Sequence, residues 1–404
     1  MKDKTLILTG LTTAYLTTFI GSPFVFIALP LICEDIGLTA TLTGLVIGSF
    51  GIAKLLFDVP AGYIIDRYGK KKTLLIGSAV VALAYLSFGV LLMNSIPLEL
   101  TIMYLLMTRI LDALGSSFIF VSSPSIIGSL TPSEKRGMTY SLTTILPGLG
   151  GFAGMSLAGL SASVLGPYLT ILIYGALFTL IFVIYVVTVS ERIVPKVEEK
   201  VTWNDISKLA QDKRILTIAY LNFAWSLPRV AFFFIIPYVA VKNYGLLPTV
   251  ASSFAGLPML VSSPMGVFGG WVCDRYGRKP VVLVSTMILA LSTVLLSFPG
   301  SLMLFLLACL LAGLGGFGGA ALTAYLTDIA PAAAYGRTFA LTTITFDLSW
   351  ALGPALGYYL LGSYGQPSLF ATMSVLLGAG VLVFMRTCEK AIRCDLGSDQ
   401  SPYT

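Results

Sequence analysis

Twelve long apolar runs are the feature of this sequence that most restricts its fold. About 20 apolar residues in a helix cross the hydrocarbon core of a bilayer. The runs lie at 6–30, 40–64, 73–93, 100–129, 139–163, 167–189, 215–241, 248–272, 281–298, 301–327, 338–362 and 367–386. Of the 404 residues, 56% are hydrophobic and 11% are charged. This composition excludes a soluble enzyme, a disordered chain and a nucleic-acid-binding protein, because each needs many more polar groups. We predict an all-α membrane protein with twelve transmembrane helices.

Lysine and arginine are distributed unequally between the two sides of the predicted membrane. With the N-terminus inside, the inner segments hold 21 of the 25 lysines and arginines, and Lys242 is the one basic residue of the outer loops. Positively charged loops mark the cytoplasmic side of a membrane protein. We therefore expect a multi-pass protein of the cytoplasmic (plasma) membrane, embedded in the lipid bilayer, with both termini in the cytoplasm.

A polar stretch divides the chain into two parts with six predicted spans each. We expect an N-terminal six-helix bundle at 1–189, a cytoplasmic linker at 190–214, a C-terminal six-helix bundle at 215–386 and a cytoplasmic tail at 387–404. The chain has no histidine, and its five cysteines form no CxxC pair. We therefore predict no metal site and no cofactor, and we expect a monomer.

The two predicted halves share a loop motif. Gly62-Tyr-Ile-Ile-Asp-Arg-Tyr-Gly-Lys-Lys71 follows the second run, and Gly270-Trp-Val-Cys-Asp-Arg-Tyr-Gly-Arg-Lys279 follows the eighth, 208 residues later. A second inner-loop element carries Asp328 and Arg337 after the tenth run. Internal repeats of this kind are typical of secondary transporters.

Two copies of G-x-x-x-D-R-x-G-[RK]-[RK] in a six-plus-six chain resemble the signature loop of the major facilitator superfamily. The resemblance covers essentially the whole chain and implies that family's fold, with substrate bound between two halves that rock about it. It also implies a cytoplasmic gate formed by Gly62, Asp66, Arg67, Gly69, Gly270, Asp274, Arg275, Gly277, Asp328 and Arg337. Gly62 and Gly270 would let neighbouring helices approach closely, and Gly69 and Gly277 would permit tight turns. The alternative is a basic loop that only sets topology, which would not require the glycines and the aspartates.

Six charged residues lie inside the predicted spans, where each costs roughly 2.5–3.5 kcal/mol at a helix centre on insertion scales. They are Lys54, Asp58, Arg109, Asp112, Arg229 and Asp347. They occur on the second, fourth, seventh and eleventh spans, which the family resemblance places around a central cavity. We therefore predict that they form the substrate or proton pathway.

A structural role for these charges is the alternative. Lys54 and Asp58 are four residues apart and Arg109 and Asp112 are three apart, so each pair can neutralise itself on one helix. Arg229 and Asp347 could pair across the cavity of the C-terminal half. Because three cations face three anions, the sequence implies no strongly charged substrate.

The predicted function is secondary active transport of a small organic solute by alternating access, without enzymatic activity. Leu146-Pro147-Gly-Leu-Gly150-Gly151 is similar, out of register, to the glycine–proline motif of the family's drug and metabolite exporters. This likeness favours proton-coupled efflux by antiport. Proton-coupled uptake of a sugar or small metabolite, and a non-transporting receptor on the same fold, are the alternatives. Without histidine the proton carrier would be a carboxylic acid, for which Asp347 and Asp112 are the candidates.

Overall fold

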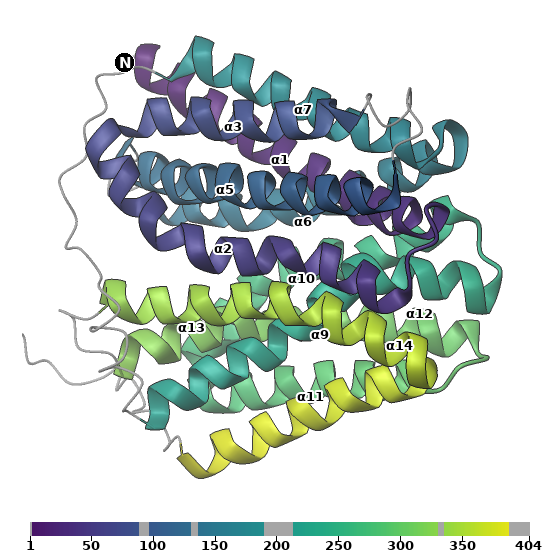
Figure 1. The fold of residues 1–404 in the computed structure, drawn as a ribbon. Helices are drawn as coiled ribbons and strands as arrows, with labels where there is room; N and C mark the ends of the chain where they lie inside the picture. The colour runs from purple at the N-terminus through teal and green to yellow at the C-terminus, as the bar shows by residue number, and fades with distance from the viewer. Residues whose placement is uncertain (1, 89–96, 131–135, 190–212, 330–334, 388–404) are drawn as a thin grey trace, which may run out of the picture.

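The structure is a computed structural model that describes residues 2–88, 97–130, 136–189, 213–329 and 335–387 (Figure 1). Within these ranges all regular structure is helical, and ten helices are long and apolar enough to cross a membrane. The prediction of an all-α membrane protein is confirmed. The predicted linker and tail fall almost wholly outside the described residues.

The helices from the two parts of the chain occupy different regions of the molecule, the first part above and the second below in the view of Figure 1. The upper helices are α1 (Lys2–Asp35), α2 (Ala40–Tyr68), α3 (Lys70–Leu86), α5 (Leu98–Leu130), α6 (Arg136–Leu165) and α7 (Pro167–Thr188). The lower ones are α9 (Lys213–Tyr244), α10 (Pro248–Tyr276), α11 (Arg278–Leu296), α12 (Leu302–Leu314), the short 3-10 helix η2 (Gly315–Phe317), α13 (Gly318–Ile329) and α14 (Tyr335–Thr387).

The helices correspond to the predicted apolar runs, with two differences in how they are divided. The runs 338–362 and 367–386 form the single element α14, which changes direction at Gly365, where φ is +80°. The run 301–327 is covered by α12, η2 and α13 in succession. Helix α3, with 17 residues, ends at Leu86 inside the predicted run 73–93, and Ser87 caps it with its backbone N–H; residues 89–96 lie outside the described ranges.

The repeated motif makes the same turn in both halves. Gly69 ends α2 with φ of +90°, and Gly277 ends α10 with φ of +85°. Each glycine donates its backbone N–H to the carbonyl oxygen four residues earlier, at 2.9 Å. Side chains rarely adopt this left-handed backbone region, so glycine allows the chain to start the next helix at once. The prediction of tight turns at these two glycines is confirmed.

Small residues bring helices together inside the first half. A Cβ atom added at Gly77 of α3 would lie 2.6 Å from the carbonyl oxygen of Gly115 on α5, and one added at Gly115 would lie 2.5 Å from the carbonyl oxygen of Gly77. Lipid gives little hydrophobic drive for helix association, so close van der Waals packing at small residues supplies it. The α3–α5 contact therefore depends on both glycines.

We predict that Gly77→Leu lowers the free energy of unfolding by about 1–3 kcal/mol, because the new side chain meets backbone atoms that cannot move aside. Gly378→Leu is the matched control, since nothing lies within 4 Å of a Cβ atom added there. Denaturant unfolding of the purified protein in mild detergent measures both variants. Equal losses in the two would contradict the packing argument.

Candidate functional site

The six charges inside the spans fall into three separate places. Arg109 and Asp112 lie buried among α3, α5 and α7. Lys54, Asp58 and Asp347 meet between α2 and α14. Arg229 lies alone in a cavity of the second half. The charges are neutralised to a different extent in each of the three places.

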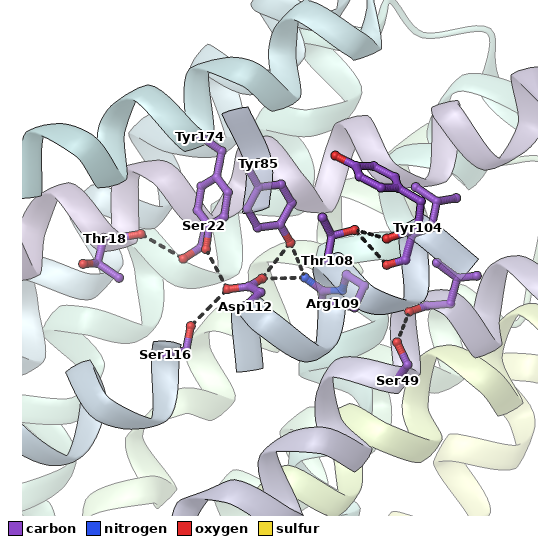
Figure 2. Close-up of polar contacts among 12 residues, drawn as sticks. Thr18, Ser22, Ser49, Tyr85, Tyr104, Thr108, Arg109, Asp112, Ser116 and Tyr174 are labelled. Carbon is purple, nitrogen blue, oxygen red and sulfur yellow. Dashed lines mark hydrogen bonds and ion pairs between the residues drawn. The ribbon is translucent and has the colours of Figure 1, made fainter. Parts of the chain in front are cut away.

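Asp112 is the centre of a buried polar network (Figure 2). Its Oδ2 accepts hydrogen bonds from Nη1 of Arg109 and from the hydroxyl of Tyr85, both at 2.7 Å. Its Oδ1 accepts from Ser116 at 3.1 Å and from Tyr174 at 3.4 Å. Four donors on three helices thus satisfy one carboxylate, and Arg109 pairs with Asp112 as in the structural alternative.

The same network ties Arg109 to the face where the halves meet. Its guanidinium carbon lies 4.5 Å from the ring centroid of Phe50 on α2, a cation–π distance. The ring of Phe50 in turn lies 5.9 Å from that of Trp350 on α14. Arg109 is only 1% exposed, so in this conformation it contacts protein groups and no open cavity.

Lys54 lies between two carboxylates from opposite halves of the chain. Its Nζ is 2.7 Å from Oδ2 of Asp58, one turn along α2, and 3.7 Å from Oδ1 of Asp347 on α14. Ser117 of α5 also donates a hydrogen bond to Asp58. Oδ1 of Asp347 is buried and has no hydrogen-bond partner among the described residues. Its contact with Lys54 is therefore an ion pair without a hydrogen bond.

This cluster contains one more carboxylate than it has cations. With all three groups ionised, its net charge is negative in an apolar environment, which is unfavourable. One proton on either carboxylate would make the cluster neutral. The strength of this contact between α2 and α14 therefore depends on the charge of the cluster.

Arg229 lines a cavity of about 240 Å³ among α9, α13 and α14. The polar residues of its lining are Asn222, Ser226, Arg229, Thr323 and Thr342. Trp225 and Phe346 add aromatic surface. Arg229 is exposed although it lies in the middle of α9, and it is the one charged residue of the lining. The cavity thus presents a positive charge well inside a predicted span.

The expected ion pair between Arg229 and Asp347 is wrong. Asp347 pairs with Lys54 of the other half, and Arg229 has no ion pair or hydrogen bond among the residues that the structure describes. The reason is topological, because α14 packs against both α9 and α2. The charge of Asp347 is directed to the α2 side, which helix spacing along the sequence cannot reveal.

The two halves are tightly joined at one end of the molecule, on the right in Figure 1. A Cβ atom added at Gly44 of α2 would lie 2.6 Å from the carbonyl oxygen of Pro354 on α14. One added at Gly159 of α6 would lie 2.9 Å from the carbonyl oxygen of Pro248 on α10. Backbone atoms of the two halves thus approach closely on both sides of this end, which we call the closed end.

The opposite end holds the Gly69 and Gly277 turns. A Cβ atom added at Gly62 or Gly270 would meet nothing within 4 Å among the described residues. That these two glycines bring helices together stays a prediction for another conformation. We call this end the motif end. Its helices α2 and α10 are those that pack against the other half at the closed end.

The remaining predicted gate residues are only partly described. Arg67 and Arg275 lie over the rings of the neighbouring Tyr68 and Tyr276, at 5.6 Å and 5.7 Å. Asp274 is 4.0 Å from Nη1 of Arg278, one turn along the chain. The side chains of Asp66, Asp328 and Arg337 lie outside the described residues.

Several residues that complete these sites were not predicted from the sequence. Tyr85 and Tyr174 donate hydrogen bonds to Asp112, and Ser117 donates one to Asp58. A tyrosine in the middle of an apolar run indicates a buried hydrogen bond, because a buried hydroxyl needs a partner. Which partner it has depends on how the helices pack.

Comparison with known proteins identifies the family. The family model described as Major Facilitator Superfamily matches residues 11–247 and 218–393. The hexuronate transporter of Bacillus subtilis (strain 168) is 25% identical over 409 residues, covering 95% of this chain and 93% of the relative. The multi-drug resistance efflux pump PmrA homolog of Lactococcus lactis is 27% identical over 367 residues, covering 85% of this chain and 86% of the relative.

Solved structures have the same fold. A mutant of the nucleoside transporter NupG superposes with a TM-score of 0.77 at 14% identity, covering 95% of this chain and 100% of that one. A bacterial homolog of the human lysosomal transporter Spinster gives a TM-score of 0.76 at 14% identity, covering 96% of this chain and 98% of that one. At this identity the likeness concerns the fold alone.

We predict that Asp112→Asn lowers the free energy of unfolding by about 3–5 kcal/mol, because it leaves the buried Arg109 without a counter-ion. Tyr85→Phe removes one hydrogen bond from the same carboxylate and should cost about 0.6–2 kcal/mol. Unfolding in mild detergent compares the two. A loss for Asp112→Asn no larger than that for Tyr85→Phe would show that the charge pair is not what holds this network.

Because part of the cavity lining is exposed, we expect water-soluble reagents to reach it. In a variant whose native cysteines are replaced by serine, Thr323→Cys should react rapidly with a water-soluble maleimide, because Thr323 is an exposed residue of the lining. Thr286→Cys is the control, since Thr286 is 1% exposed. Mass spectrometry of labelled protein gives both rates, and equal rates would mean that the cavity is closed to water.

Proposed function

Because this chain belongs to the Major Facilitator Superfamily, it is a multi-pass membrane protein and a secondary transporter, and we propose that it moves a small organic solute in a proton-coupled cycle of alternating access. The observation that carries this proposal is the Lys54 cluster, in which two carboxylates share one ammonium group across the two halves. A cluster of this kind can couple protonation to movement of the halves.

The cluster supports coupling through its charge. When both carboxylates are ionised, Lys54 attracts Asp347 and holds α2 and α14 together. A proton on Asp347 removes that attraction and lowers the cost of separating the helices. A ligand shifts a conformational equilibrium only by its differential affinity for the two states, and here the proton acts as that ligand.

The packing of the helices supports the alternating cycle. Glycine contacts join α2 to α14 and α6 to α10 at the closed end, and at the motif end a Cβ atom added at Gly62 or Gly270 would meet no described atom within 4 Å. In the opposite state of the cycle these two glycines would approach the facing helices while the closed end separates. We propose that the two motif loops, with Asp328 and Arg337, form the gate of that state.

The topology and assembly follow the charge distribution of the sequence. We propose a protein of the cytoplasmic membrane with both termini in the cytoplasm, so that the motif end faces the cytoplasm and the cavity opens inward. The two rocking units are the bundles at 1–189 and 215–386, and one chain is sufficient for the cycle.

Export in exchange for protons is the first candidate direction. The motif around Pro147 is similar to that of exporters, and a relative named as an efflux pump matches most of the chain. Uptake together with a proton is the second candidate. It is favoured by the positive charge of the cavity, since an anion and a proton together carry no net charge, and by the hexuronate transporter that matches 95% of the chain.

Purified full-length protein in liposomes tests both the function and its direction. A solute added outside should change the lumenal pH as it enters. Acidification means that protons enter with the solute, and alkalinisation means that protons leave in exchange. D-glucuronate and ethidium serve as the anionic and the cationic probe. No solute-dependent change with any member of a wider panel of sugars, acids and drugs would contradict proton-coupled transport.

We predict that Asp347→Asn removes the solute-dependent proton flux, while exchange of labelled for unlabelled solute continues at a comparable rate. The neutral amide cannot take up a proton, but solute exchange requires no net proton movement. Glu99→Gln is the control, because Glu99 is exposed in the first turn of α5, far from the cluster in sequence and packing. An unchanged proton flux in Asp347→Asn would show that Asp347 is not part of the proton pathway.

A further inference from the structure

We propose that the cavity around Arg229 is a recognition site for a polyhydroxylated carboxylate, such as a sugar acid, whose carboxylate binds the guanidinium of Arg229. The inference rests on the proposed transport function and names its substrate class. It follows from the donors and acceptors that the cavity leaves unused.

Arg229 supplies the charge that a carboxylate needs. A guanidinium has five N–H donors in a planar fork and no acceptor, and it binds carboxylates through two parallel hydrogen bonds. Among the described residues nothing accepts a hydrogen bond from Arg229, and Asp347, the acidic residue of the facing helix α14, forms its ion pair with Lys54. An unpaired cation at this depth is costly. An anionic ligand would provide its missing partner.

Asn222 supplies an acceptor one to two turns away on α9. Its Nδ2 donates to the carbonyl oxygen of Thr342 and to the hydroxyl oxygen of Thr345, both at 2.9 Å. A carbonyl oxygen only accepts, so the amide nitrogen must face α14. Both N–H groups are then used, and Oδ1 is left as an acceptor without a partner in the described part of the chain. Asn222 is thus suited to accept from a ligand hydroxyl.

Two hydroxyl groups of the lining can likewise act only as hydrogen-bond acceptors for a ligand. Ser226 donates to the carbonyl oxygen of Asn222 at 2.8 Å, and Thr323 donates to that of Gly319 at 3.0 Å. Each hydroxyl has one donor and two acceptor lone pairs. Since the donor is used within its own helix, what remains for a ligand is an acceptor.

The cavity therefore combines one cationic donor with three acceptors, and its lining residue Trp225 has in addition a buried indole N–H without a hydrogen-bond partner among the described residues. A solute with a carboxylate and several hydroxyl groups complements this set, since its hydroxyls donate where the protein accepts. A neutral sugar would leave Arg229 unpaired, and a cationic drug would be repelled by it. The volume, about 240 Å³, is below the roughly 300–1,000 Å³ of sites for drug-sized ligands. Size and charge thus favour a single sugar acid over a large cation.

Binding of four probes to the full-length protein in detergent, measured by calorimetry, tests the inference. D-glucuronate has the carboxylate and the hydroxyls, D-glucose has only hydroxyls, valerate has only the carboxylate, and ethidium is a cation. We expect D-glucuronate to bind at least about tenfold more tightly than D-glucose or valerate, because each of these lacks one set of hydrogen bonds. Ethidium should not compete with D-glucuronate.

Variants of the cavity residues then test which side chains bind the carboxylate and the hydroxyl groups of the ligand. Arg229→Gln should weaken D-glucuronate binding by about tenfold to a hundredfold, as expected for loss of charged hydrogen bonds. Thr323→Val, nearly the same in shape, should weaken D-glucuronate binding by about two- to tenfold and leave valerate binding unchanged. Lys213→Gln is the matched control, because it removes one positive charge from the same helix at an exposed position outside the cavity.

Equal affinities for D-glucuronate and D-glucose in the wild type would overturn the inference. So would wild-type affinity for D-glucuronate in Arg229→Gln, or absence of binding by either acid at millimolar concentration. If Arg229→Gln does not fold, the order of the probes on the wild type and the Thr323→Val comparison decide. None of these outcomes affects the proposed transport function, which fails only if no solute drives a proton flux in liposomes.

Discussion

The cost of placing charge in an apolar environment is the constraint on which this structure depends. The chain meets it in three ways. Asp112 and Arg109 neutralise each other inside one half, and hydroxyl groups donate further hydrogen bonds to the carboxylate of Asp112. Lys54 is shared by two carboxylates where the halves meet. Arg229 faces an open cavity. Only in the first arrangement do the charges balance, and the other two leave a charge that a proton or a ligand can balance.

The Lys54 arrangement lies where the two halves meet. The Lys54 cluster is on α2 and α14, the same helices that pack backbone to backbone at the closed end. The rings of Phe26, Phe50 and Phe346 surround Trp350 between the two halves. A change in charge at Lys54 is therefore applied to the helix pair that must separate for the closed end to open. Arg109 is connected to the same place through Phe50.

A large part of the fold could be predicted from the sequence, because membrane spans are read from local apolar runs and turns from local glycines. The D-R-Y-G motif turned at Gly69 and Gly277 as expected. The pairs Lys54–Asp58 and Arg109–Asp112 were also predicted, since each lies within one helical turn. The partner of Asp347 was predicted wrongly, and the roles of Tyr85, Tyr174 and Ser117 were missed. These contacts join residues far apart in the sequence, and helix packing determines them.

The sequence alone determined that this chain is a bundle of membrane helices with six costly charges inside its predicted spans and a repeated motif in its two halves. These are local properties, because hydropathy, helical spacing and glycine conformations act over a few residues. Only the tertiary structure decided which charges are satisfied and which are left available. That depends on which faces of α2, α9 and α14 meet, and the energy of a charge depends on the atoms within a few ångströms of it, whatever their distance along the chain.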